Sequence, residues 1–349
     1  MADKAHGRID RKLAAMERHL TEIYTEAQGG IQKKAAAYFE KFAKADEEKR
    51  DLVRIGRLTE AEYEKWRKGK MMYGKRFTEL KENIAQQLLR VNETATAYIN
   101  GQLPEVYSLG YNALEGTVGG EGGYSFTLVD ADTVRTLATA DGSLLPSRAL
   151  DPAKDIPWNM KKVNAQVLQG ILQGESIPDI AGRMQNVAEM NRTAAVRTAR
   201  TMVTGAENKG RLDSYARAEA DGIMLQKEWL ATNDARVRHW HAELDGQLRD
   251  REDPFENAVG KIMFPGDPSA DGANVYNCRC SMAAKVIGFA KNVLTSSKNN
   301  GIMYGEKIER SVGAKSPTYP IVKYPDTDIH VDFGIGSRPV YPPDHIIAG

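Results

Sequence analysis

The residues of this chain best suited to chemistry are two cysteines, a histidine and an aspartate that lie in one segment. Cys278 and Cys280 are the only cysteines of the sequence, and one residue separates them. In an extended strand, side chains at this spacing point to the same face. Two thiolates, the imidazole of His241 and the carboxylate of Asp234, or a second imidazole in its place, would make four ligands for tetrahedral zinc. A structural zinc site with these residues as candidate ligands is therefore one interpretation of the segment.

The same residues allow two other interpretations. Both cysteines can be small buried apolar side chains, with His241 as a hydrogen-bonded core histidine. A catalytic interpretation would use Cys278 as nucleophile and His241 as general base beside Asp234, or would hold a catalytic metal with an open position. The sequence contains no nucleophile elbow, metalloprotease helix or deaminase signature. We therefore expect a protein that is not an enzyme, with a metal- or cysteine-dependent hydrolase as the alternative.

Three arginines, Arg236, Arg238 and Arg279, belong to the same segment. They can form ion pairs with acids such as Asp234 and Asp245, which would tie the two ends of the segment together. The alternative is contact with phosphates, which would make this segment a DNA-binding surface. The formal net charge of the chain is only +1, so no whole-molecule field would attract nucleic acid.

The first third of the chain is predicted to be helical. Residues from about 8 to 113 are rich in Ala, Lys, Glu, Arg and Leu and contain few prolines. Thr59 and Glu62 have the spacing of a capping box at the start of a helix. Gly29–Gly30 and Gly56 are expected breaks between helices. This pattern predicts a bundle or hairpin of long antiparallel helices with a polar outer face.

A glycine-rich joint follows at residues 116–123, and residues 124–129 have the composition of a short strand. Its glycines do not form a phosphate-binding loop, because no Gly-Lys-Ser/Thr follows and no strand precedes them. Helices are expected to resume near Asn159, with a further helix from about 192 to 220. That helix carries charges of both signs, interpreted as an exposed face. These charged residues are Glu207, Lys209, Arg211, Asp213, Arg217 and Glu219.

The hydrophobic periodicity changes after residue 222. Residues 224–230 and 281–287 are predicted strands, and Trp229 in the first of them is expected to anchor the core. After about residue 292 the chain becomes polar and then rich in Pro and Tyr, which predicts an extended tail. We therefore expect an α+β protein divided into a helical arm at 1–115, a joint at 116–158, a compact α+β domain at 159–290 and a tail at 291–349.

The composition is that of a soluble globular protein, with 41% hydrophobic and 27% charged residues. No apolar run approaches the length of a membrane span, and the N-terminal residues do not have the pattern of a secretory signal. Two cysteines in a chain of 349 residues suit a reducing compartment better than a disulfide framework. We expect no membrane partner.

The combination of motifs resembles the bacteriophage head morphogenesis family, whose minor head proteins share the Mu protein F-like domain. The resemblance covers about residues 160 to 287 and depends on motifs in a fixed order. These are Ala199-Arg200-Thr201, Trp229, Asp234-x-Arg236-Val237-Arg238-x-x-His241, Leu244-Asp245-Gly246, Phe264-Pro265-Gly266-Asp267 and Asn277-Cys278-Arg279-Cys280. One departure is Met202, where such proteins commonly carry an acidic residue.

The resemblance implies a minor capsid component without enzymatic activity. Its expected partners are the portal protein, a capsid or scaffolding protein and packaged DNA, and its expected role is in head assembly and DNA packaging or ejection. Its expected location is the virion, inside the head, after assembly in the host cytoplasm. In this interpretation the segment from Trp229 to Cys280 closes a small domain by holding its parts together. A DNA-binding protein of the head interior is a further alternative.

Overall fold

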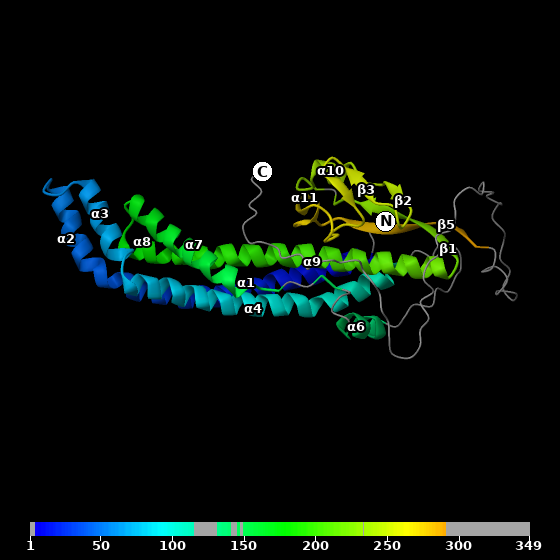
Figure 1. Cartoon of the computed structure of the whole chain (residues 1–349), viewed down its shortest axis with the longest axis horizontal. Coiled ribbons are helices and arrows are strands. Elements are labelled where there is room, and N and C mark those ends of the chain that lie inside the picture. The colour runs from blue at the N-terminus through cyan, green and yellow to red at the C-terminus, as the bar shows by residue number, and fades with distance from the viewer. Residues whose placement is uncertain (1–3, 115–130, 141–144, 147–148, 233, 291–349) are drawn as a thin grey trace.

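The computed structural model describes residues 4–114, 131–140, 145–146, 149–232 and 234–290. The expected glycine-rich joint at 116–123, the expected strand at 124–129 and the expected tail at 291–349 lie outside the described residues. Long helices form an elongated body, and a small β unit packs against one end of it (Figure 1). The predicted α+β class, with long helices followed by a compact α+β unit, is confirmed. None of the described helices is both long and apolar enough to cross a membrane.

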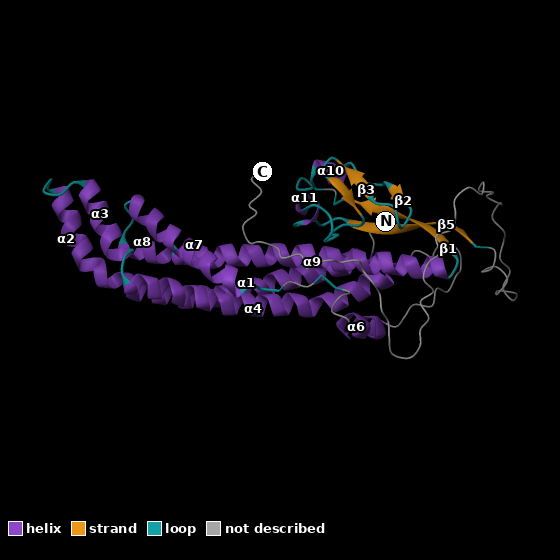
Figure 2. Cartoon of the chain, viewed as in Figure 1, coloured by secondary structure: helices purple, strands orange, loops and turns teal. Residues whose placement is uncertain are grey.

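Helices make up most of the described chain (Figure 2). Their bounds are α1 Lys4–Phe39, η1 Glu40–Phe42, α2 Ala43–Arg54, α3 Glu60–Met71, α4 Lys75–Tyr111, η2 Asn112–Leu114, α6 Ala131–Ala140, α7 Pro152–Leu172, α8 Ile177–Gly182, α9 Met184–Ala220, α10 His239–Ala242 and α11 Gly272–Val275. The strands are β1 Ile223–Leu230, β2 Leu248–Arg249, β3 Phe255–Asn257, β4 Gly260–Ile262 and β5 Ser281–Phe289. Helices α7 and α9 therefore begin several residues before the predicted starts at 159 and 192.

Helices α1, α4 and α9 run side by side through the body and bury their apolar stripes against one another. The expected break at Gly29–Gly30 was wrong, because α1 continues through both residues. A Cβ added at Gly30 would meet the amide of Gln87 on α4, so a small residue suits the helix packing there. The capping box of α3 is confirmed: Thr59 accepts from the backbone N–H of Glu62, whose carboxylate accepts from the N–H of Thr59.

The charged face predicted for α9 was partly wrong, because two of its charged side chains are buried. Glu207 is 2% exposed and Arg211 is 3% exposed. One side of α9 packs on α1 and α4, and another side lies beneath the β unit, where it contacts β1 and β5. Polar residues of this helix therefore lie between two layers of the protein. Helix periodicity alone does not reveal a second covering layer.

The β unit contains two small antiparallel sheets. The first has the strand order β2-β1-β5, and the second is the pair β3-β4. Both strands expected from sequence are confirmed: β1 pairs with β5, with Trp229 opposite Met282 and Leu230 opposite Ser281. Trp229 is fully buried and packs edge-to-face on Phe255 with ring centroids 5.2 Å apart. This small core includes both cysteines.

Candidate metal site and its contacts with the helical body

His241, Cys278 and Cys280 converge in the core of the β unit. Nδ1 of His241 lies 3.6 Å from Sγ of Cys278 and 3.6 Å from Sγ of Cys280. With Zn–S bonds of about 2.3 Å and Zn–N bonds of about 2.0–2.1 Å, neighbouring N and S ligands of a tetrahedral zinc are about 3.6 Å apart. All three ligand atoms lie within 4.8 Å of one another. The three side chains form a group that could hold a metal ion.

The three side chains are well shielded from solvent. His241 is 1% exposed and each cysteine is 2% exposed. The ring of His241 lies edge-on to Trp229, with centroids 5.4 Å apart. The other ring nitrogen of His241, Nε2, is buried and forms no hydrogen bond within the described residues. The indole therefore sets the position of the ring, while Nδ1 is the nitrogen that faces the sulfurs.

The hydrogen bond between the two thiols shifts their pKa values in opposite directions. The hydrogen bond between them raises the pKa of Cys278, and burial raises it further. The same hydrogen bond lowers the pKa of Cys280 to about 4, an effect that burial opposes and the neighbouring His241 reinforces. The backbone N–H of Cys280 also lies 3.4 Å from Sγ of Cys278. A pair that loses a proton readily is suited to binding a cation.

Asp234, the fourth ligand proposed from sequence, does not join this group. Two guanidinium nitrogens of Arg279 donate to its two carboxylate oxygens, at 2.6 and 2.9 Å. Hydrogen bonds from Arg279 and from the backbone N–H of Arg236 hold the pKa of Asp234 well below its ordinary value. Among the described residues the metal-ligand group has three members. Because Asp234 is bound to Arg279, the proposed Cys-His-Asp catalytic arrangement also lacks its carboxylate partner.

The other arginines of the segment have different environments. The guanidinium of Arg238 donates to the carbonyl oxygen of Tyr276, just before the Asn-Cys-Arg-Cys motif. Arg236 is largely exposed, and its guanidinium lies 3.4 Å from Asp234. The predicted ion pairing across the segment is therefore present between Arg279 and Asp234. Of the three arginines considered for DNA contact, Arg238 and Arg279 are already used to hold the fold together.

Helix α9 fixes the backbone of the cysteine motif. The hydroxyl of Thr204 donates to the carbonyl of Cys278 at 2.7 Å, and the hydroxyl of Thr201 accepts from the N–H of Asn277 at 2.9 Å. Asn208 accepts from the N–H of Met282 at 3.0 Å. Sequence analysis singled out Thr201 and overlooked the other two. The available signal was their spacing, since three polar residues recur along one face of an otherwise Ala- and Val-rich helix.

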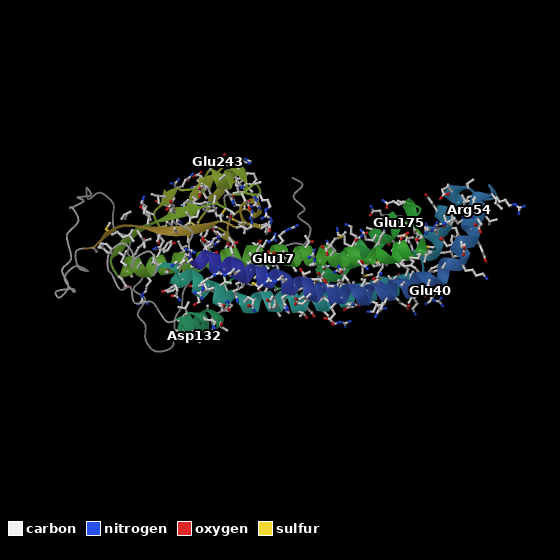
Figure 3. The ribbon with its side chains drawn as sticks, turned by 180° about the vertical axis from the view of Figure 1, so that it is seen from behind. Glu17, Glu40, Arg54, Asp132, Glu175 and Glu243 are labelled. Atoms are coloured by element: carbon white, nitrogen blue, oxygen red, sulfur yellow. The ribbon has the colours of Figure 1, made fainter. Side chains whose placement is uncertain are left out.

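Arg200 links α9, α1 and the cysteine motif. Its guanidinium donates to the carboxylate of Glu17 on α1 at 2.6 Å, and a second nitrogen lies 3.4 Å from Oδ1 of Asn277. Figure 3 shows Glu17 on the helical body at the edge of the β unit. Asn277 has a φ of 57°, in the left-handed region that asparagine tolerates better than most residues. The Arg-Thr motif of α9 and the Asn-Cys-Arg-Cys motif are thus in direct contact where α9 packs against the β unit.

Two glycines and two aspartates of the motifs shape the loops around the site. Gly266, with a φ of 81°, lies so close to Gly205 of α9 that a Cβ on either glycine would meet the backbone of the other. Asp267 accepts from the N–H groups of Met263 at 3.0 Å and Ser269 at 2.9 Å. Asp245 accepts from the N–H of Ala231 at 2.8 Å, beside Gly246 with its φ of 73°. These motif residues therefore set backbone conformation.

A buried ion cluster joins the N-terminal helix to the site. Nδ1 of His6 lies 2.9 Å from the carboxylate of Glu207, which also accepts from Arg211 at 3.1 Å and from the hydroxyl of Ser281 at 3.0 Å. Burial raises the pKa of Glu207, but the hydrogen bond from His6 and the charge of Arg211 outweigh it, so the net shift is downward. Sequence analysis did not identify this cluster, whose members lie in three distant segments.

Lys227 is a second buried cation that sequence analysis missed. Its side chain is fully buried in β1, and its ammonium group donates to the carbonyls of Arg251 at 3.0 Å and Met263 at 2.8 Å. Burial and the nearby charge of Arg251 lower its pKa to about 8, despite nearby acids. The lysine thus holds two loops of the β unit onto the central strand.

Comparison with known proteins supports the family resemblance that the sequence motifs indicated. The family described as Phage Mu protein F like protein matches residues 161–283, which contain α9 and most of the β unit. Minor head protein GP7 of Bacillus phage SPP1 is 23% identical over 299 residues, covering 84% of this chain and 89% of that protein. That alignment therefore includes most of the helical body. No solved structure gave a significant match.

Two further relatives match shorter parts. The NAD(+)–arginine ADP-ribosyltransferase EFV of Enterococcus faecalis is 27% identical over 209 residues, covering 56% of this chain and 41% of that protein. Protein YqbB of Bacillus subtilis is 26% identical over 166 residues, covering 42% of this chain and 53% of that protein. The chain thus spans about half the length of these two relatives or less.

The sequence motifs, the domain match and the likeness to a minor head protein agree with one another. The chain carries a Phage Mu protein F-like domain at residues 161–283 and is similar to a minor head protein along most of its length, which supports the predicted phage head morphogenesis family.

Proposed function

We propose that this phage head protein is a minor capsid component that binds the portal and assists head assembly and DNA packaging or ejection. The observation that carries the proposal is the extent of the likeness to GP7, which covers 84% of this chain rather than the Mu F-like domain alone. The proposed location is inside the head, after assembly with capsid or scaffolding proteins in the host cytoplasm. Helices α1, α4 and α9 support the domain along one side and leave the rest of the body available for a partner.

The composition of the body indicates what kind of portal contact to expect. Its apolar stripes are already buried in its own core, so they are not free to enter a groove on a partner. A few large apolar residues among those described are exposed. They are Ile55, Tyr73, Leu137, Leu172 and Met224. A portal contact on this surface would be largely polar, and so it would weaken as salt is added.

Co-sedimentation of the purified full-length chain with portal rings of the same phage tests this proposal. We expect the chain to sediment with the rings at 50 mM salt and to be released progressively toward 500 mM. Capsid protein without portal serves as the control for non-specific pelleting. Absence of co-sedimentation at every salt concentration, together with normal heads from a phage that lacks the gene, would exclude the proposed role.

We further propose that His241, Cys278 and Cys280 hold a structural zinc ion. The spacing of Nδ1 from the two sulfurs equals that of ligands on one zinc, and the donor set of two thiolates and an imidazole is one that zinc prefers. The ion would join α10 to the segment before β5 and so close the small domain. Such a site contributes to folding and needs no substrate access, in keeping with its burial.

We propose no catalytic activity for the chain. The thiols lie in a packed core, and the carboxylate that a Cys-His-Asp mechanism requires is bound to Arg279. The likeness to the ADP-ribosyltransferase covers less than half of that protein, so its named activity is not carried over. Incubation with labelled NAD⁺ and an arginine-containing acceptor should give neither hydrolysis nor transfer, and turnover in this assay would contradict the proposal.

A further inference from the structure

The turn between α3 and α4 carries a concentrated positive charge. Residues 65–76 contain six lysines and arginines and no acid, whereas the formal net charge of the whole chain is +1. Arg67 is buried and paired with Asp46 at 2.9 Å. The remaining cations are exposed and are called the tip cations here. They are Lys65, Lys68, Lys70, Lys75 and Arg76.

The tip cations are almost free of acidic partners. Lys75 is 91% exposed, and its ammonium group lies 3.9 Å from Glu79, at the outer limit of an ion pair. The other four form no ion pair with the described residues. Some exposed cations elsewhere on the body have a close acid, such as Asp132 at 2.9 Å from Arg135. The tip cations are therefore available to a partner.

The position of two of these cations does not favour stability. Lys75 and Arg76 open the 37-residue helix α4, whose first turn contains no acid. Cations are disfavoured at this end of a helix because the backbone dipoles already make it positive. Helix α3 follows the usual rule, with Glu60 and Glu62 in its first turn. The last turn of α3, with Lys68 and Lys70, meets the first turn of α4 at the same place, so the charges of both helices add.

This turn lies far from the β unit. Helices α2 and α3 lie at the end of the body opposite the β unit (Figure 1), and Figure 3 shows Arg54, the last residue of α2, at that end. Helix α4, about 55 Å long at 1.5 Å per residue, starts there and runs back toward the β unit. The turn is thus an exposed basic surface, located where α3 returns to the body and α4 begins. Tyr73, with 65% of its side chain exposed, lies within it.

We propose that the tip cations contact the phosphate backbone of duplex DNA. Exposed lysines without fixed partners suit sequence-independent contact with phosphates, because each neutralised phosphate releases a counterion. An acidic protein surface fits less well, since specific protein interfaces usually include an apolar centre and the tip offers only Tyr73 among its exposed large apolar residues. Duplex DNA is the polyanion that a phage head encloses. The inference goes beyond portal binding and does not require it.

Fluorescence anisotropy with a labelled 30-bp duplex tests this contact. The tip variant replaces all five tip cations by Gln: Lys65→Gln, Lys68→Gln, Lys70→Gln, Lys75→Gln and Arg76→Gln. A matched control removes five exposed cations from other parts of the molecule: Arg11→Gln, Arg18→Gln, Arg90→Gln, Lys161→Gln and Lys261→Gln. Both variants lower the net charge equally. All ten positions are exposed, and circular dichroism will verify that both variants remain folded.

The wild-type chain is expected to bind the duplex at 50 mM salt with a steep salt dependence. The tip variant should bind at least about 30-fold more weakly, and its slope of log K against log salt should fall by about 4.5, or about 0.9 for each of the five lost contacts. The control should change affinity by less than about threefold. Equal losses in both variants, or no binding by the wild type, would overturn the proposal. A tip variant that binds DNA normally and no longer sediments with portal rings would assign this surface to a protein instead.

Discussion

The hydroxyl of Thr204 donates a 2.7 Å hydrogen bond to the carbonyl of Cys278, so the long helix α9 directly holds the backbone of the cysteine motif. Thr204 is 4% exposed. Helix α9 and the β unit are therefore bonded through their interior, and the metal-ligand group includes the residue that accepts this bond.

Thr204→Val should destabilise the protein, because it keeps the shape of the side chain and leaves the carbonyl of Cys278 buried without this donor. The expected loss in the free energy of unfolding is about 1–3 kcal/mol, measured by urea denaturation. Thr94→Val on α4 is the control, since Thr94 is exposed and its hydroxyl bonds only to its own helix, at Arg90. That variant should stay within about 0.5 kcal/mol of wild type. Equal effects at both positions would show that the Thr204 bond adds nothing.

Purified protein is expected to contain one zinc per chain by elemental analysis. Cys280→Ser and His241→Ala should each lose the ion. His239→Gln should keep it, because His239 is exposed on the same short helix and is not part of the ligand group. Chelation should lower the free energy of unfolding by about 3 kcal/mol if free zinc was at 100 times its Kd. A metal-free wild-type protein whose stability does not respond to added zinc would refute the site.

The ion cluster of His6 predicts a loss of stability at alkaline pH. Burial lowers the pKa of His6, but the hydrogen bond and charge of Glu207 outweigh it and raise the pKa from 6.5 to about 9. The folded state thus binds this proton at pH values where the unfolded state has released it. The resulting stabilisation is complete below pH 6.5 and disappears as the pH rises through about 9. Its size is about 2 kcal/mol, discounted because 28% of the imidazole is exposed.

Comparison of wild type with His6→Gln measures this contribution across pH 6–10. Lys227 changes stability in the opposite direction: its pKa falls from 10.5 to about 8 on folding, so its contribution to stability rises as the pH increases from about 8 to 10.5. Both proteins retain Lys227, and the difference between them therefore isolates His6. The difference should shrink toward zero as the pH approaches 9. Parallel curves for the two proteins would mean that His6 is not protonated in the folded state at neutral pH.

Local signals predicted much of this protein, and contacts between distant segments explain the rest. The capping box of Thr59 and Glu62 was predictable because both partners lie in one turn of one helix. The grouping of Cys278 and Cys280 near His241 was expected from residue type and spacing. The pairing of Asp234 with Arg279 rather than with His241 was only one of several alternatives, because sequence does not reveal which partner is nearer.

Burial of charge was the hardest property to predict. Glu207 and Arg211 occupy positions that suit a solvated helix face, and only the β unit packed over α9 makes them interior. Similarly, Gly29–Gly30 resembled a break, although the fold continues α1 through them. In each case the residues that pack against these positions come from a remote part of the chain. Charge pattern and glycine content alone do not identify those residues.

The crossing of α4 and α9 gives a sharp test of the helical body. A Cβ on Gly110 of α4 would overlap the carbonyl oxygen of Glu207, and a Cβ on Gly210 of α9 would overlap that of Tyr107. Both obstacles are backbone atoms, which cannot rotate away. Gly110→Ala should therefore force the helices apart and lower the free energy of unfolding by about 3 kcal/mol, a typical cost of overpacking.

Gly101→Ala is the matched control on the same helix. A Cβ there would meet nothing within 4 Å, so the substitution should instead stabilise the protein by about 0.5–1 kcal/mol through better helix propensity. If thermal or urea denaturation shows that Gly110→Ala lowers the free energy of unfolding and Gly101→Ala raises it, backbone contact between α4 and α9 beside Glu207 is established. Because His6 and Ser281 also bond to Glu207, Gly110→Ala should in addition lower the pKa of His6 toward its ordinary value. An unchanged imidazole titration in a destabilised Gly110→Ala protein would show that the crossing and the ion cluster are independent.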